Sequence, residues 1–151
     1  MAEFTQNSVQ TVLANQPVTL NTTIGCNKGY VYHRDGSGIV TLRGVVNNAC
    51  ANFARYQVTF NGNIAVPTDG TVGPIAIAIA LDGEPIQTSR AIVTPAAADE
   101  YFNVTSTAII TVPRGCCENV TVENVSFGAT AAATPTAINV QNANLVVSRI
   151  A

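Results

Sequence analysis

The segment from residue 75 to residue 81 alternates large and small apolar side chains, Ile-Ala-Ile-Ala-Ile-Ala-Leu. Successive side chains of a β-strand point to opposite faces, so the isoleucines and Leu81 would fill a core while the alanines form a small, uncharged second face. Such a face suits close approach by another sheet or subunit better than contact with water. Asp82 and Gly83 follow as a tight-turn signal before residues 84–86 restart the chain, which predicts a β-hairpin.

The rest of the chain is also typical of strands, because Val, Ile and Thr are plentiful and Leu is scarce. β-branched side chains fit a pleated, half-buried surface better than a helix. Clusters of Gly, Pro, Asn and Asp separate the apolar segments, and this spacing without helical periodicity predicts an antiparallel sandwich or barrel. Further strands are expected at residues 9–13, 18–24, 29–33, 39–46, 53–66, 91–94, 102–112, 119–126 and 145–150.

The order of these segments resembles the jelly roll of the tumour necrosis factor and complement C1q globular-head superfamily. The resemblance rests on residues 53–66, the hairpin from residue 75, residues 108–115 leading into 120–124, and the closing segment 144–151. The order is similar in particular to bacterial and phage members, such as phage head decoration or fibre-type proteins. This resemblance implies an all-β, antiparallel two-sheet jelly-roll sandwich that forms a homotrimer. We expect residues 1–15 to be an N-terminal arm or first strand, and residues 16–151 to be the jelly-roll domain.

The apolar strands also supply candidates for a subunit interface. In the jelly roll that this sequence resembles, the closing strand lies in the inner sheet near the threefold axis. A terminal strand as apolar as residues 145–150 is expected to pair on both sides. Its two faces would divide between the sandwich core and the interface, and the sequence does not decide which face goes where. The interface candidates are Ile75, Ile77, Ile79, Leu145, Val147 and Arg149.

Composition removes several classes of partner. Charged residues make up 11% of the chain, against roughly 25% in an ordinary soluble domain. Seven Lys and Arg against nine Asp and Glu give a net charge of -2, so no cationic surface is large enough to hold a nucleic acid by counterion release. The longest apolar run, residues 75–81, is too short to span a bilayer, which needs about 20 such residues. We expect neither a nucleic-acid nor a membrane partner.

The N-terminal segment shows no signal-peptide pattern of basic residues followed by an apolar run. We therefore expect synthesis in a host cytoplasm and, for a phage protein, a final location in the virion. No Gly-X-Y tract is present, so no collagen-like stalk is expected and attachment would use the globular body or the first residues.

Side chains suited to catalysis are scarce. The chain has one His, so His33 would have to serve any catalytic triad, and no Ser lies in a Gly-X-Ser-X-Gly elbow. His33-Arg34-Asp35 resembles a kinase catalytic loop, but no Gly-rich phosphate loop accompanies it, so a strand end leading into a turn is the better explanation. Asp99-Glu100 is the only adjacent acidic pair and is expected in a solvated loop. We predict no enzyme activity, no catalytic residue, no cofactor and no metal ligand.

The four cysteines, Cys26, Cys50, Cys116 and Cys117, leave two alternatives open. They form no Cys-X-X-Cys zinc knuckle, and adjacent cysteines rarely hold one ion together. All four fall at strand ends or in turns, so one or two disulfides would tie loops at one end of the sandwich in an oxidising environment. Reduced, buried thiols that act as small apolar side chains are the equally weighted alternative. Cys116 and Cys117 are expected in the turn between two late strands.

Two functions from different classes fit these observations. The favoured one is a non-enzymatic structural protein, a homotrimeric jelly roll that decorates or projects from a phage capsid and contacts other virion proteins. The alternative is a carbohydrate- or receptor-binding module on a bacterial cell or spore surface, with a host-surface glycan as ligand. The side chains that would stack on a sugar are Tyr30, Tyr32, Tyr56 and Tyr101, which are as readily explained as core or interface residues.

Overall fold

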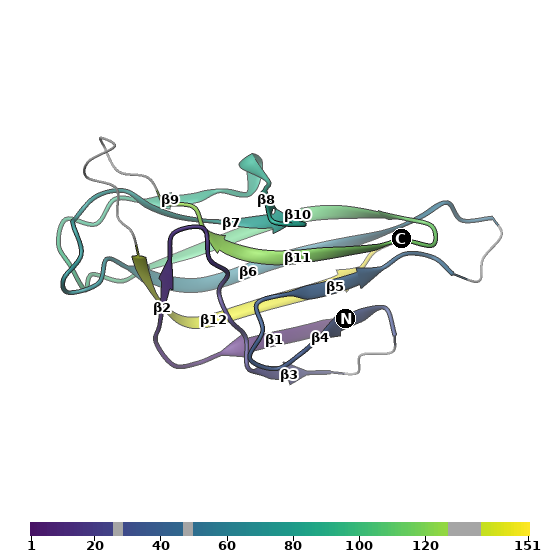
Figure 1. Cartoon of the computed structure of the whole chain (residues 1–151), viewed down its shortest axis with the longest axis horizontal. Coiled ribbons are helices and arrows are strands. Elements are labelled where there is room, and N and C mark those ends of the chain that lie inside the picture. The colour runs from purple at the N-terminus through teal and green to yellow at the C-terminus, as the bar shows by residue number, and fades with distance from the viewer. Residues whose placement is uncertain (26–28, 47–49, 127–136) are drawn as a thin grey trace.

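The computed structural model describes residues 1–25, 29–46, 50–126 and 137–151. Two antiparallel β-sheets run along the long axis of the molecule, and both termini lie toward one end, on the right of Figure 1. The first sheet has the order β10 (Phe102–Pro113), β6 (Phe53–Ala65), β12 (Ala137–Arg149), β1 (Ala2–Gln6) and β3 (Thr22–Ile24), with β2 (Gln10–Leu13) beside β12. The second has the order β4 (Val31–His33), β5 (Val40–Arg43), β11 (Cys117–Asn124), β7 (Ile75–Leu81) and β8 (Glu84–Pro85), with β9 (Ala91–Val93) beside β7.

The predicted all-β, antiparallel two-sheet sandwich is confirmed. Within the described ranges, the single helical element is the three-residue 3-10 turn η1 (Gln87–Ser89). One apolar core fills the space between the sheets, with Phe4 of β1 and Phe60 of β6 fully buried on one side and the isoleucines of β7 fully buried on the other. Burying a side chain of this size stabilises the fold by about 1.5–3 kcal/mol relative to leaving it exposed.

The core takes up most of the predicted interface residues. Five of them are completely buried within the chain: Ile75, Ile77, Ile79, Leu145 and Val147. These five residues are therefore corrected from interface candidates to core residues, because the inward face of each strand packs against the opposite sheet. Arg149, at the end of β12, is exposed. The alanine face of β7 is also buried within the chain and is not open to a partner.

The closing strand is longer than the sequence predicted, because β12 begins at Ala137 and not at Leu145. The polar run before Leu145 is typical of a loop, but it lies within the strand. A β-bulge between Gln141 and Asn144 absorbs it, with Asn142 in a left-handed backbone conformation at φ 55°. β12 pairs with β6 on one side and with β1 and β2 on the other, so the predicted pairing on both sides is confirmed.

The chain begins with a strand that belongs to the sandwich. β1 pairs with β12 and with β3. The sequence left open whether the N-terminal segment is an arm or a first strand, and residues 2–6 form a strand. The predicted hairpin is confirmed, since β7 pairs with β8 and the turn residues Asp82 and Gly83 have φ of 50° and 84°. Both values lie in the left-handed region that a two-residue hairpin turn requires.

Candidate functional site

One end of the sandwich gathers arginine and aromatic side chains. It lies where β5 and β12 end and where β4 and β6 begin, on the right of Figure 1. The guanidinium of Arg149 lies 4.6 Å from the centre of the Tyr30 ring, and that of Arg55 lies 4.6 Å from the centre of the Phe53 ring. Both are cation–π contacts. We call this surface, with Arg43 at the end of β5, the arginine end.

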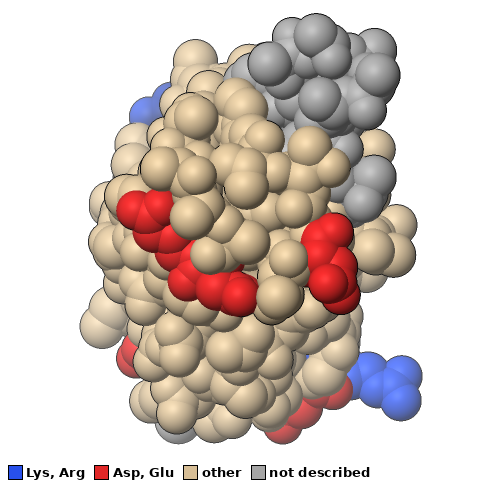
Figure 2. Space-filling view, turned by 90° about the vertical axis from the view of Figure 1, so that its left-hand side faces the viewer, with Lys and Arg blue, Asp and Glu red and all other residues tan. Residues whose placement is uncertain are grey.

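The arginine end is short of negative partners. Arg43, Arg55 and Arg149 form no ion pair with an Asp or Glu of the described residues. Figure 2 shows the opposite end of the molecule, where acidic groups lie on a largely uncharged surface. Asp99 and Glu100 lie there in the loop before β10 and are exposed, as the sequence predicted. Arg149 Nε donates a hydrogen bond to the oxygen of Ala151 (3.2 Å). Because surface cations attract anions, the arginine end suits a negative ligand.

Main-chain contacts on both sides hold Arg43 in place. Its N–H donates to the oxygen of Tyr30 (2.9 Å), and its own oxygen accepts a hydrogen bond of 2.6 Å from the hydroxyl of Tyr56, which is buried in the first sheet. The next residue, Gly44, passes so close to the β10–β11 turn that a Cβ would lie 2.1 Å from the oxygen of Pro113. Only glycine fits this approach, so the end of β5 is fixed against the other sheet.

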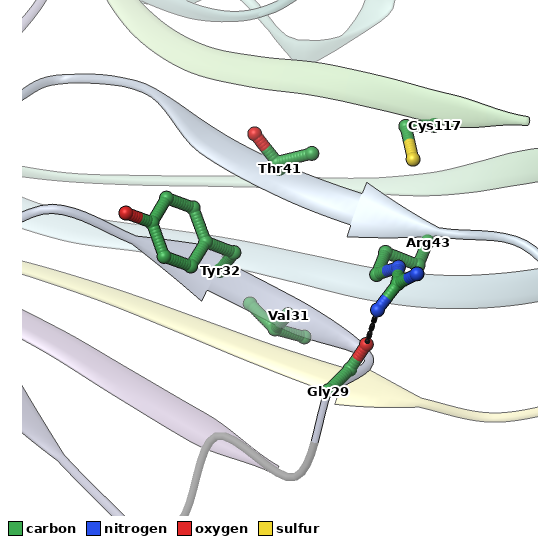
Figure 3. A pocket seen from close by; sticks show the side chains of 6 residues that line it. All are labelled: Gly29, Val31, Tyr32, Thr41, Arg43 and Cys117. Atoms are coloured by element: carbon green, nitrogen blue, oxygen red, sulfur yellow. Dashed lines mark hydrogen bonds between the residues drawn. The ribbon is translucent and has the colours of Figure 1, made fainter.

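A groove of about 340 Å³ opens beside Arg43. The strand register explains how its walls come together, since Tyr32 pairs with Thr41 across β4 and β5, and Arg43 pairs with Cys117 across β5 and β11. Directly paired residues of antiparallel strands project to the same face of a sheet. Figure 3 shows the lining residues, which are Gly29, Val31, Tyr32, Thr41, Arg43 and Cys117.

The groove offers several kinds of binding group. Arg43 Nη1 donates a hydrogen bond to the oxygen of Gly29 (3.3 Å), drawn as a dashed line in Figure 3. Thr41 Oγ1 donates to Asn119 Oδ1 (2.9 Å), which extends the polar row to the next strand. The only histidine, His33, is buried on the other face of β4 and its Nε2 lies 2.9 Å from the oxygen of Ser37. An aromatic ring, a hydroxyl, an amide and a cation are groups that bind a polar ligand.

The tyrosines predicted to stack on sugars do not lie together. Tyr56 is completely buried, so its ring is a core residue and that part of the prediction is wrong. Tyr101 lies before β10 at the opposite end of the sandwich. The Tyr30 ring is covered on one side by Arg149. Tyr32 is 63% exposed and lines the groove, and it is the one of the four that a ligand reaches in the groove.

The described cysteines lie at the arginine end. Cys116 lies in the turn between β10 and β11, as predicted, whereas Cys117 is the first residue of β11. Cys50 lies in the segment before β6. All three side chains are exposed, so the buried-thiol alternative is wrong for them. Cys116 and Cys117 form no disulfide with each other. Cys26, which the sequence grouped with them, lies outside the described residues.

Two carboxyl groups that do not line the groove share a hydrogen bond that the sequence did not reveal. Asp82 lies in the β7–β8 turn and Glu118 on β11, and this bond lowers the pKa of Asp82 and raises the pKa of Glu118. Asp82 also accepts a hydrogen bond of 3.1 Å from the N–H of Asn119. In the part of the chain that the structure describes, no three His, Cys, Asp or Glu side chains are grouped so as to hold a metal ion.

No family model and no curated protein matches the chain. Among solved structures, the globular domain of zebrafish complement 1qA protein is similar to it with a TM-score of 0.53 at 13% identity, over 96% of this chain and 94% of that one. A weaker likeness is to the sugar-binding EclA C-terminal domain, with a TM-score of 0.37 at 16% identity over 82% of this chain and 87% of that one. The CBM22-1 xylan-binding domain of Paenibacillus barcinonensis Xyn10C gives 0.34 at 9% identity, over 99% and 87% of the two chains.

At 13% identity, the likeness to the C1q globular domain concerns architecture alone, since one fold supports many functions. The chain therefore has the jelly-roll fold of the C1q globular domain, which confirms the predicted fold class. No helix among the described residues is long and apolar enough to cross a membrane.

Proposed function

We propose that the chain is a non-enzymatic structural module that assembles as a homotrimer and serves as a surface component of a phage virion, in contact with capsid proteins. The observation that carries the proposal is the outward face of the first sheet. On the outward-facing positions of β6, β10 and β12, the one charged side chain is that of Arg55, and Glu3 of the neighbouring strand β1, which accepts a hydrogen bond from Asn144, adds one carboxylate at the edge of this face. Charged residues are depleted at the centre of protein interfaces, whereas a surface exposed to water ordinarily carries many.

The uncharged side chains of this face are already ordered. Thr59 on β6 and Thr107 on β10 share a hydrogen bond of 3.1 Å. Asn61 Oδ1 accepts hydrogen bonds from Asn103 and Thr105, each at 3.1 Å. Side chains fixed in this way lose little conformational entropy when a second copy covers them. The face therefore suits self-association better than its polar composition alone indicates.

Ile109 on β10 is the most useful position for a test of assembly. Its side chain is 61% exposed on this face, opposite Gln57 of β6. The unmodified protein is expected to have the mass of three chains in light scattering, and Ile109→Asp is expected to give a folded monomer because it buries a carboxylate at the interface. Ile92→Asp, at an isoleucine of β9 that is also about half exposed, is the matched control and keeps the trimer. A monomeric parent protein would overturn the homotrimer.

The virion location rests on the resemblance of the segment order to phage members of the superfamily and on the low charge of the chain. Mass spectrometry of purified particles tests it directly. The protein is expected in intact particles and accessible to antibodies on their surface. Its absence from every particle preparation of its own phage would refute the virion role.

A second candidate function is binding of a glycan, and the groove at the arginine end favours it. An exposed tyrosine ring beside a hydroxyl and an amide is the combination that stacks on a sugar and holds its hydroxyl groups. Tyr32 and Thr41 line the groove and provide the ring and the hydroxyl, and Asn119, which pairs with Thr41 from β11, provides the amide beside it. A glycan array with the trimeric protein tests this function, and Tyr32→Ala is expected to remove the binding while Tyr101→Ala, at the other end, keeps it.

A further inference from the structure

Arg43 gives the groove a fixed positive charge. Within the described residues its guanidinium donates one hydrogen bond, to the oxygen of Gly29, and lies in no ion pair. A guanidinium has five N–H donors, so this bond leaves donors for a ligand. Tyr30, Tyr56 and Gly44 hold the main chain on which it stands, and the bond to Gly29 orients the guanidinium itself. Preorganised donors of this kind bind a carboxylate in a two-bond, planar geometry.

Tyr32 stands at the right separation from this charge. It pairs directly with Thr41, and Arg43 is two residues further along β5. Such diagonal neighbours on one face lie about 7–8 Å apart at their Cα atoms, and both side chains line the groove. A ring resting on Tyr32 would therefore bring a carboxylate substituent to Arg43. The groove volume of about 340 Å³ is at the small end of the range of about 300–1,000 Å³ for ligand pockets, so the groove has room for one sugar unit.

The polar row beside Tyr32 recognises hydroxyl groups. Thr41 Oγ1 donates its proton in a hydrogen bond to Asn119 Oδ1 (2.9 Å). The lone pairs of the hydroxyl oxygen therefore remain able to accept a hydrogen bond from a ligand. The side-chain amide of Asn119 keeps two N–H donors that no described residue occupies. Neutral donors and acceptors next to an aromatic face match the alternating C–H and O–H edge of a pyranose, and they give no reason to prefer a simple anion.

We infer that the groove between Tyr32, Thr41 and Arg43 binds a single acidic sugar unit, a pyranose that carries a carboxylate, as part of a cell-surface polysaccharide. Arg43 pairs with the carboxylate, the Tyr32 ring stacks on the C–H face, and Thr41 and Asn119 hold the hydroxyl groups. The inference rests on the glycan-binding function proposed above and names the class of sugar. It does not depend on the trimer or on the virion.

Titration of the isotope-labelled full chain, followed by NMR, tests the inference with methyl glucuronide, its neutral counterpart methyl glucoside, and acetate. The glucuronide is expected to shift the amide signals of Tyr32, Thr41, Arg43 and Cys117, and to bind about tenfold or more tightly than either other probe, the ratio expected for one charge-assisted pair. Arg43→Gln is expected to remove the preference for the acid and retain weak sugar binding. Arg55→Gln, which removes a charge from the same end outside the groove, leaves the preference unchanged.

Three results would overturn the inference in different ways. Equal binding of glucuronide and glucoside in the groove would refute the acidic class and leave a glycan-binding function intact. Equal binding of acetate and glucuronide would show an anion site without sugar recognition. Absence of shifts with both sugars, together with a blank glycan array, would refute glycan binding altogether.

Discussion

The hydroxyl of Tyr56 donates a hydrogen bond of 2.6 Å to the main-chain oxygen of Arg43 and so joins the two sheets at the arginine end. Tyr56 belongs to β6 of the first sheet and is completely buried, whereas Arg43 ends β5 of the second sheet. Burial raises the pKa of Tyr56 above its ordinary value of 10.0, because the ionised phenol would lose its hydration. A core residue therefore positions the charged residue of the groove.

Tyr56→Phe tests this link. The substitution leaves the packing unchanged but deprives a carbonyl group of its partner, so the free energy of unfolding is expected to fall by about 1–1.5 kcal/mol. The parent protein should also lose stability as the pH rises above 10.0, where the unfolded chain ionises the phenol and the folded chain does not. The variant lacks this alkaline component. Urea titrations between pH 8 and about pH 11 measure both effects, and equal stability of the two proteins at every pH would contradict the link.

The carboxyl pair of Asp82 and Glu118 predicts a stability change at acidic pH. The lowered pKa of Asp82 contributes stability above its ordinary value of 3.8 that is lost as the pH falls through the lowered value. The raised pKa of Glu118 contributes stability below its ordinary value of 4.5 that is lost as the pH rises through the raised value. The pair is therefore most favourable when it holds one proton, and this contribution is lost as the pH rises through the raised pKa of Glu118.

Glu118→Gln should retain the hydrogen bond to Asp82 at every pH above the pKa of Asp82, because an amide donates without titrating. We expect the variant to unfold at higher urea concentration than the parent protein at pH 7, and the difference to shrink as the pH falls toward the pKa of Asp82. Glu84→Gln, a charge change on the neighbouring strand β8, is the control without this bond. A pH-independent difference between Glu118→Gln and the parent protein would contradict the shared proton.

The sequence predicted the strands in which large and small or polar side chains alternate at every second residue. It did not predict which residues of different strands lie side by side, because that depends on strand pairing. Residues 75–81 alternate without interruption, and β7 has the predicted bounds. β1 has one large apolar side chain, Phe4, so its local pattern is short and it was left as one of two alternatives. Tyr32 was a candidate for sugar stacking, but its row with Thr41 and Asn119 joins three strands that are distant in sequence. Register of that kind is set by the whole core and not by local spacing.

The two adjacent cysteines at the start of β11 predict a reactive pair of thiols. Cys116 and Cys117 are exposed and form no disulfide with each other. Both are expected to react with a thiol reagent in the native protein without reductant, and a bulky adduct on Cys117 should fill the groove and block sugar binding. Peptide mapping by mass spectrometry identifies the labelled residues, with Cys117→Ser as the control that labels only Cys116 of the pair. Labelling that requires prior reduction would show a disulfide and contradict this prediction.

Neighbouring residues of the closing strand β12 face opposite sides, so substitutions there distinguish the stability of one chain from the assembly of the trimer. Leu145 faces the core and is completely buried, whereas its neighbour Val146 faces outward, between Thr59 of β6 and Glu3 of β1. Leu145→Ala should lower the free energy of unfolding by about 2–5 kcal/mol, the range for emptying such a core position.

Val146→Ala should leave the stability of one chain within about 0.5 kcal/mol of the parent protein, as for most surface changes, while it weakens the trimer. Deletion of residues 145–151 removes Leu145 and Val147 from the core and also the partner of β1 at Ala2. Its cost, about 1.5–3 kcal/mol for each lost core side chain in addition to the unpaired strand, is a large part of the 5–15 kcal/mol that holds a typical domain together. We expect the truncated chain not to fold. Circular dichroism and light scattering measure fold and assembly separately, and a truncated protein that remained a folded trimer would contradict the central position of β12.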